Sequence, residues 1–266
     1  MLLDPERPKV RRNEVEKVIR KAGVRLSPER PDFAIVVGGD GVFSYYGRSG
    51  PVPLLFVGVR SVHATGSKAF LAEIYFDELE RALVAIRGGR YMVVEHKRLE
   101  VLKNRRRLGE VFTDMYLQRS AESNSIRYRV EVSGARSISE SGIGDGVVVC
   151  THAGSTGYYS YPDKIRAGDW LESGRYTVIG EDEIGICHLV PTYTSRNGSS
   201  VQPLRYTIPW QSRVTVKLVR EADARVYGVT ADRSGVKVGV GDVITIRPSR
   251  GTTQLMKVEP QLSNKK

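Results

Sequence analysis

Cysteine is scarce in this chain of 266 residues, which contains only Cys150 and Cys187. Two cysteines cannot build a disulfide framework, and these two lack the spacing of metal ligands. The four histidines form no HExxH motif or similar cluster. The sequence therefore gives no sign of a disulfide-rich secreted protein, and a reducing cytoplasm with free thiols is the simplest expectation.

Long apolar runs are also missing. No segment approaches the roughly 18 consecutive apolar residues of a membrane span. The first residues, MLLDPERPKVRR, have neither a sustained apolar stretch nor a small-residue cleavage pattern. We therefore expect no membrane partner and no targeting signal. With 40% hydrophobic residues, the chain can still build packed cores, and its length predicts one large or two ordinary domains.

Acidic residues are outnumbered by basic ones, 30 to 41, which gives a formal net charge of +11. Such an excess is compatible with nucleic-acid binding, because basic patches supply most non-specific affinity. The charge is spread along the chain, however, and its one dense run, Lys103 to Arg107, lies in a predicted hairpin turn. We therefore expect no nucleic-acid partner, and the positive field equally suits a protein that binds polyanionic nucleotides.

Residues 31 to 41, PDFAIVVGGDG, are the most informative stretch of the sequence. Four apolar residues, 34 to 37, lead directly into Gly38 to Gly41. This pattern is typical of a strand buried on both faces that ends in a tight turn. Phosphates could approach a turn so poor in Cβ atoms, with Asp40 at its rim. A turn in which the glycines only make the bend and Asp40 caps the next helix explains the pattern equally well.

The flanking segments predict a small parallel α/β layer. An apolar stripe at helical spacing predicts a helix over 13 to 22, with Asn13 as N-cap and Gly23 as its end. A second buried strand is predicted within 51 to 58, and another helix from about Asp77 to Gly88. Ligands of such sheets bind at the carboxyl ends of the strands, where the loops 38–41 and 59–68 would emerge.

From about Tyr91 the pattern changes to that of antiparallel strands. Residues 126 to 132 and 213 to 219 alternate between apolar and polar side chains. Further short strands are predicted at 98–102, 111–117, 147–150, 184–189, 225–230 and 243–246. We therefore predict an α/β plus mainly-β fold, with a parallel α/β domain over 1–92, to which a tail of about 250–266 returns, and an antiparallel β-rich domain over 93–249.

A second group of candidate residues lies in 144 to 161, GDGVVVCTHAGSTGYYSY. Asp145 stands between glycines before an apolar strand, and glycines, hydroxyl side chains and tyrosines follow that strand. Such residues can bind a sugar, a phosphate or a base. A Ser/Thr/Gly-rich hairpin loop with half-buried tyrosines accounts for the segment equally well.

Together, GGDG at 38–41 and DGVVVCTHAGSTGY at 145–158 resemble the NAD kinase family, which carries both motifs in this order and at this spacing. The resemblance extends over nearly the whole chain, including GVTADRSGVKVGVGDVITIRPS near its end, and it is that of a diverged, archaeal-type member. It implies a kinase that transfers a phosphoryl group from ATP or polyphosphate to the 2′-hydroxyl of the adenosine ribose of NAD, giving NADP. It also implies Mg²⁺ or another divalent cation, nucleotide ligands and a homo-oligomer, either a dimer or a tetramer.

The resemblance also assigns roles to individual residues. Asp40 takes the place of the catalytic Asp, and Asp145 that of the acid that contacts the nicotinamide end of NAD. Arg60 or Lys68 would add positive charge near the phosphates. The remaining nucleotide-binding positions are Gly38, Gly39, Gly41, Phe70 near the adenine, the 113–114 pair Thr113 and Asp114, and Thr156, Gly157 and Tyr158 of the NAD pocket.

Several positions depart from the family pattern. Thr113 replaces Asn, Asp114 replaces Glu and Gly157 replaces Ala, and the loop 59–68 keeps only part of its glycine spacing. These departures leave open a non-catalytic NAD or NADP binding relative. A third hypothesis is a lipid kinase of the diacylglycerol or sphingosine type, since these enzymes share GGDG, although they lack a GSTGY-type segment.

Overall fold

The computed structural model describes residues 1–3, 10–27, 29–59, 69–121, 124–166, 177–199, 203–230 and 234–258. The chain forms two compact units, which we call unit 1 (Met1–His96 with Thr252–Lys266) and unit 2 (Lys97–Gly251). The predicted domain boundaries lie within a few residues of these limits. That the two units are separate folding domains stays a prediction.

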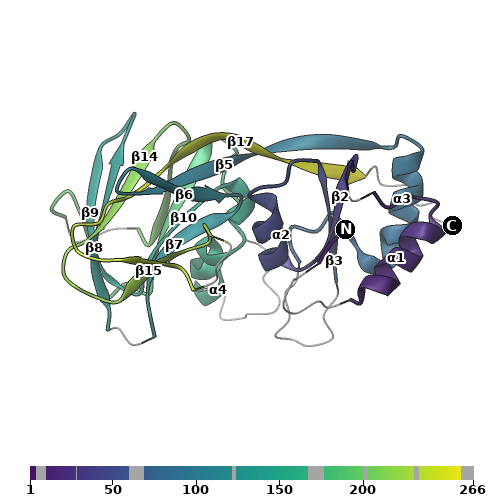
Figure 1. Ribbon diagram of the computed structural model, residues 1–266. Helices are drawn as coiled ribbons and strands as arrows, with labels where there is room; N and C mark the ends of the chain where they lie inside the picture. Colours follow the sequence, from purple (N-terminus) through teal and green to yellow (C-terminus); the bar gives the residue numbers. More distant parts are fainter. Residues whose placement is uncertain are drawn as a thin grey trace. The chain divides into compact units, whose positions relative to one another are not determined.

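Unit 1 is built on parallel strands. Its sheet contains β1 (Leu2–Leu3), β2 (Ala34–Gly38), β3 (Leu54–Gly58) and β4 (Ile74–Tyr75), and the end of β17 pairs with β3 through Leu255 and Leu54. Every residue of β2 and β3 is buried, because helices cover both faces of the sheet. Figure 1 shows α1 (Arg12–Lys21) and α3 (Leu79–Arg87) together on one face and α2 (Asp40–Gly47) on the other.

Successive side chains of β2 and β3 point alternately toward the two helical layers. Ile35 and Val37 of β2 pack with the apolar stripes of α1 and α3. On the opposite face, Phe43 of α2 stacks on Phe56 of β3 with ring centroids 4.5 Å apart. This double coverage explains why both strands have continuous apolar sequences and no alternation.

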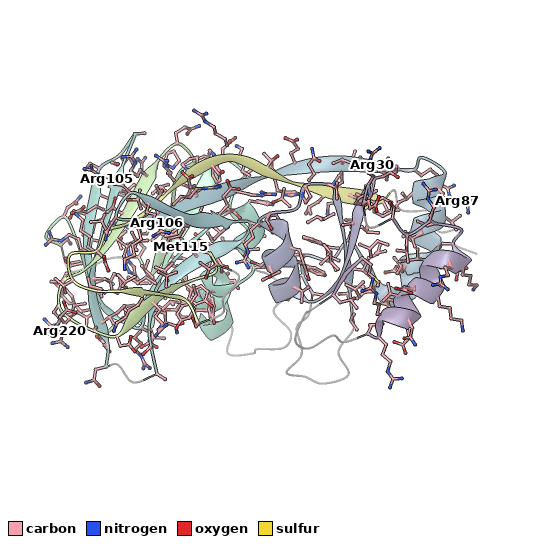
Figure 2. The ribbon with its side chains drawn as sticks, in the orientation of Figure 1. Arg30, Arg87, Arg105, Arg106, Met115 and Arg220 are labelled. Atoms are coloured by element: carbon pink, nitrogen blue, oxygen red, sulfur yellow. The ribbon has the colours of Figure 1, made fainter. Side chains whose placement is uncertain are left out.

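The helix ends of unit 1 correct one prediction and confirm another. Asn13 is not the N-cap of α1, since the helix begins at Arg12 and Arg11 is the N-cap. The Arg11 N–H donates to Glu14 Oε2 at 3.0 Å, so a carboxylate in the first turn satisfies this amide. Gly23 ends the helix as predicted, with φ +68. Arg87, labelled in Figure 2, donates to the carbonyl of Ala22 at the same helix end at 2.8 Å. The second predicted helix is α3, which a 3₁₀ turn (Phe76–Glu78) precedes.

Unit 2 consists of two layers of antiparallel strands. One sheet has the order β13-β11-β10-β7-β15-β16, and in the other β17, β14, β8, β9 and β12 follow one another, with the hairpin β5–β6 beside β17. Strands β5 and β17 each begin in one unit and end in the other. The strand bounds are β5 Tyr91–Lys103, β6 Arg106–Val111, β7 Asp114–Arg119, β8 Ile126–Ser133, β9 Ile138–Gly144, β10 Gly146–Cys150, β11 Glu183–Leu189, β12 Tyr193–Arg196, β13 Arg205–Pro209, β14 Arg213–Leu218, β15 Ala224–Tyr227, β16 Val236–Val238 and β17 Ile244–Val258.

The core of unit 2 lies between its two sheets. Val130 and Val132 of β8 contribute to it from one sheet, and Val147 and Val149 of β10 from the other. Met115 lies among the strands in the interior of unit 2, whereas Arg105 and Arg220 lie at its periphery (Figure 2). Three short helical segments follow β10, namely 3₁₀ turns at His152–Gly154 and Tyr158–Ser160 and α4 (Tyr161–Arg166).

The predicted α/β plus mainly-β fold class is confirmed, and most strands lie where they were expected. The alternating segments 126–132 and 213–219 form β8 and β14. The prediction of a single strand over 111–117 is wrong, because β6 ends at Val111 and β7 begins at Asp114. The basic run at 103–107 is a hairpin turn as predicted, in which Asn104 and Arg105 have φ of +51° and +68°. None of the described helices is long and apolar enough to cross a membrane.

Candidate functional site

The glycine turn of unit 1 places Asp40 at the start of a helix. Strand β2 ends at Gly38, Gly39 is the N-cap, and Asp40 is the first residue of α2. The alternative in which Asp40 is the N-cap is therefore wrong. The Leu71 N–H donates to Asp40 Oδ1 at 2.9 Å, so a backbone amide from a distant segment helps to orient this carboxylate.

The same contact brings the predicted residue Phe70 close to Asp40. Phe70 precedes Leu71 and is 44% exposed, which leaves its ring accessible. The segment from Ala69 approaches the end of β3 closely, where a Cβ on Gly58 would lie 2.9 Å from the Cβ of Ala72. Of the predicted phosphate contacts, Arg60 and Lys68 lie outside the described residues.

The glycines around Asp40 have different functions in the fold. A Cβ on Gly38 would lie 2.9 Å from the Cβ of Val42, so Gly38 lets α2 pack closely on its own strand. A Cβ on Gly41 would meet nothing within 4 Å. The first turn of α2 is thus open to solvent at Gly41. The N–H groups at the start of the helix and the positive end of the helix dipole suit an anion such as a phosphate.

In unit 2 the predicted residues Thr113, Asp114, Gly157 and Tyr158 lie together. Thr113 Oγ1 donates to Asp114 Oδ1 at 3.1 Å. A Cβ on Gly157 would lie only 3.3 Å from Asp114 Oδ2, so glycine leaves room for this carboxylate. Burial raises the pKa of Asp114 to about 6, against the smaller lowering effect of the Thr113 hydrogen bond.

Strand pairing explains why these two distant segments meet. Strands β7 and β10 are antiparallel, with Asp114 opposite Cys150. After β10, the Thr151 N–H donates to the Thr113 carbonyl at 2.8 Å, and a Cβ on Gly154 would collide with that same carbonyl. The turn that holds Thr156, whose carbonyl accepts a hydrogen bond from the Ser160 hydroxyl at 2.9 Å, therefore lies against the start of β7.

Two tyrosines that the sequence did not single out extend this group. The ring of Tyr158 meets that of Tyr116 edge-on at 5.1 Å, and Tyr116 stacks on Tyr227 at 5.2 Å. Tyr116 points to the same face of β7 as Asp114, two residues earlier, and that spacing was the available signal. Tyr227 lies opposite Tyr116 on β15, and only the strand pairing reveals this position.

Asp145 lies at the opposite end of β10 from Asp114. The five residues of β10 separate them by roughly 17 Å at the usual rise of a strand. The carboxylate Oδ1 of Asp145 is 2.6 Å from Arg119 Nε, a partner that the sequence did not predict. Gly146 has φ +148, and a Cβ there would collide with the carbonyl of Leu117, so only glycine fits.

The described residues contain no group of three or more His, Cys, Asp or Glu side chains that could hold a metal ion. A metal cage made by the protein alone is thus absent from this part of the chain. Mg²⁺ is usually bound by one or two carboxylates together with substrate phosphates. A single carboxylate such as Asp40, beside a turn open to phosphates, fits that donor set.

Comparison with solved structures defines the fold. The chain is similar to yeast NADH kinase complexed with NADH (17% identity, TM-score 0.63, 88% of this chain and 64% of the yeast chain). It is also similar to an NAD kinase from Archaeoglobus fulgidus in complex with ATP (20% identity, TM-score 0.59, 93% of this chain and 89% of that chain). The fold is therefore that of NAD and NADH kinases, although the chain spans less than two thirds of the yeast protein.

Curated sequences then identify the family. The chain is 30% identical over 239 residues to the NAD kinase of Geobacter sulfurreducens, covering 86% of this chain and 74% of the relative. It is 31% identical over 232 residues to the NAD kinase of Aquifex aeolicus, covering 85% and 75%. An archaeal NAD kinase, from Thermoplasma volcanium, is 25% identical over 93% of this chain and 82% of the relative. No family model matches the chain. The chain belongs to the NAD kinase family, which confirms the resemblance drawn from the two motifs.

Proposed function

We propose that this protein phosphorylates the 2′-hydroxyl of the adenosine ribose of NAD, with ATP as the phosphoryl donor, and releases NADP. Membership of the NAD kinase family supports the reaction. The observation that carries the proposal is the position of Asp40 at the first turn of α2, with its carboxylate oriented by the Leu71 N–H and the open position of Gly41 beside it.

Phosphoryl transfer needs the protein mainly to position the reactants and to neutralise charge. A carboxylate is far too weak a base to deprotonate an alcohol in its ground state. Asp40 instead orients the attacking hydroxyl and accepts its proton while the new P–O bond forms. The first turn of α2 holds phosphate oxygens through backbone N–H groups. A divalent cation, when bound, neutralises the charge on the donor phosphates.

The remaining residues serve NAD binding in this proposal. Asp114, with Thr113 as its hydrogen-bond donor, and the tyrosine rings around Tyr158 offer a polar group beside aromatic faces, which suits a nucleoside. Asp145 would bind a hydroxyl or amide donor of the nicotinamide half. Arg119 next to it forms an ion pair with this carboxylate, with Nε 2.6 Å from Oδ1, and so helps to orient it.

Polyphosphate is the alternative phosphoryl donor. The proposal also includes a cytoplasmic location and a homo-oligomeric state. Both cysteines are free and buried, which fits a cytoplasmic protein. The family resemblance supports a homo-oligomer. A lipid kinase finds no support, since neither the relatives nor the structures named above are lipid kinases.

The test is NADP formation from NAD and Mg²⁺ with either ATP or polyphosphate. We expect Asp40→Asn to lower kcat by roughly 10²- to 10⁴-fold, because it removes the proton acceptor. The dissociation constant of NAD, measured by calorimetry, should change little, because Asn keeps the size of the side chain. Asp32→Asn is the matched control, since Asp32 is exposed and precedes β2.

Near-normal turnover in Asp40→Asn would refute the role of Asp40. A wild-type protein that binds NAD but forms no NADP with either donor would identify a non-catalytic relative. Activity with polyphosphate alone would replace ATP as the donor and leave the assignment of the acceptor unchanged.

A further inference from the structure

The core of unit 2 contains a polar cluster in an otherwise apolar environment. Tyr128 on β8, Glu140 on β9 and His188 on β11 are all fully buried or nearly so. His188 points to the same face of β11 as Ile184 and Ile186, which belong to the apolar core. Burying such groups costs free energy unless each one has a partner. The cluster therefore calls for an explanation beyond packing.

A chain of polar contacts connects this cluster to the backbone next to Asp145. The Tyr128 hydroxyl donates to the carbonyl oxygen of Gly146 at 2.8 Å. A tyrosine hydroxyl has one hydrogen, so His188 Nδ1, which lies 2.8 Å from the Tyr128 oxygen, is the donor in that second contact. Glu140 Oε2 lies 3.3 Å from His188 Nε2 on the other side of the ring.

At the far end of this chain of contacts, Glu140 and His188 have further partners. The Tyr206 hydroxyl donates to Glu140 Oε2 at 2.5 Å, and Arg196 Nε donates to Glu140 Oε1 at 2.8 Å. Arg196 also lies over the ring of Tyr206, 4.1 Å from its centroid. The backbone carbonyl of His188 accepts a hydrogen bond from the Tyr161 hydroxyl at 3.0 Å. Tyr206 and Arg196 thus hold Glu140, and Tyr161 holds the backbone of His188, which limits the movement of the His188 ring beside Tyr128.

The backbone at Gly142 and Gly146 is adapted to this arrangement. A Cβ on Gly142 would lie 2.5 Å from Cζ of Tyr128, so glycine makes room for the ring. Gly146 has φ +148, a conformation that glycine adopts readily and other residues rarely do, and its carbonyl meets the tyrosine hydroxyl. The backbone of Asp145 itself is held by two hydrogen bonds of 2.9 Å. The Asp145 N–H donates to the Leu189 carbonyl, and the Asp145 carbonyl accepts from the Arg119 N–H.

Resting on the proposed function, we propose that Tyr128 and His188 are positioning residues for NAD binding. They hold the Gly146 carbonyl and so fix the Gly144–Gly146 turn from which the Asp145 carboxylate extends. Neither side chain touches the nucleotide in this proposal, because both are buried in the core. Their effect reaches the substrate through Asp145, and so it should appear in the affinity for NAD and not in the chemical step.

The experiment compares two variants that each remove one hydroxyl from the same network. Tyr128→Phe removes the donor to Gly146, whereas Tyr206→Phe removes a donor to Glu140, which is the fourth contact along the chain from Gly146. We expect Tyr128→Phe to raise the KM for NAD about tenfold, with kcat and the KM for ATP within about twofold of wild type. Hydrogen exchange of the amides in 143–150 should accelerate about tenfold as well. Tyr206→Phe should change neither quantity, although its melting temperature should fall to a similar extent.

Equal effects of the two variants on the KM for NAD and on exchange would overturn the proposal, since they would indicate a general loss of core stability. Unchanged exchange at 143–150 in Tyr128→Phe would overturn it too. A wild-type protein that forms no NADP would refute the proposed function separately, and the exchange data would still decide whether Tyr128 holds the turn.

Discussion

The carboxyl group of Asp114 lies where burial and a neighbouring hydroxyl act on its pKa in opposite directions. Burial dominates and raises the pKa to about 6, from an ordinary value of 3.8, and the Thr113 hydroxyl partly offsets this effect. The folded protein therefore binds this proton more tightly than the unfolded chain does. The carboxylate is still mostly ionised at pH 7, as its proposed role as a hydrogen-bond acceptor for NAD requires.

This shift predicts a dependence of stability on pH. A raised carboxyl pKa contributes stability below the unfolded value of about 4, and that stability is lost as the pH rises through the folded value. Relative to Asp114→Asn, the free energy of unfolding of the wild type should fall by about 2 to 3 kcal/mol between pH 4 and pH 7. Urea unfolding of both proteins at these two pH values measures the difference.

Thr113→Val serves as the control for this prediction. Removing the hydroxyl that donates to Asp114 should raise the pKa further and enlarge the loss of stability between pH 4 and pH 7. Parallel pH profiles of the wild type and Asp114→Asn would show that Asp114 titrates at its ordinary pKa in the folded protein.

At the scale of elements, the short helix α2 connects the packing of unit 1 with its proposed chemistry. Phe43 fixes one face of the helix against β3, and Gly38 allows close approach to β2. The N-terminal turn, with Asp40 and Gly41, remains accessible. The two glycines therefore make separable contributions, one to stability and the other to ligand access.

Substitution of these glycines should have opposite effects on stability. Gly41→Ala should stabilise the protein by about 0.5 to 1 kcal/mol, because Gly41 is helical and its Cβ would meet no atom. The KM for ATP should rise nonetheless, since the methyl group would stand where phosphates approach. Gly38→Ala, the control, should destabilise the protein by about 1 to 3 kcal/mol through its clash with Val42. Thermal unfolding and steady-state kinetics test both, and an unchanged KM for ATP in Gly41→Ala would argue against phosphate binding at this turn.

At the scale of the whole molecule, β17 returns the chain to unit 1 after it has built unit 2. Leu255 is buried and pairs with Leu54 of β3, while Ile244 and Ile246 of the same strand belong to the core of unit 2. Each unit thus has its own core. We infer that the two units are separate domains.

Point substitutions in each core test this inference. Leu255→Ala should cost unit 1 about 2 to 4 kcal/mol, and Val216→Ala should cost unit 2 a comparable amount. If the units unfold independently, calorimetry should show each variant lowering a different thermal transition. A single transition that both variants shift equally would mean that the chain unfolds as one cooperative domain.

Much of the fold was predictable because its signals are local. The continuous apolar runs ending in glycine identified β2 and β3, and alternation identified β8 and β14. The cap of α1 and the break between β6 and β7 were missed, because a capping carboxylate and a strand end depend on contacts that a propensity pattern does not contain.

The sequence by itself determined the order of the motifs, the family and the residue types of the candidate site. These follow from the identity and spacing of residues along the chain, as in the glycines around Asp40 and Asp145. Only the tertiary structure decided the partners of those residues, which are Leu71 for Asp40, Arg119 for Asp145 and the tyrosine rings around Tyr158. The physical reason is strand pairing, since the register of β7, β10 and β15 brings together side chains that lie far apart in the sequence.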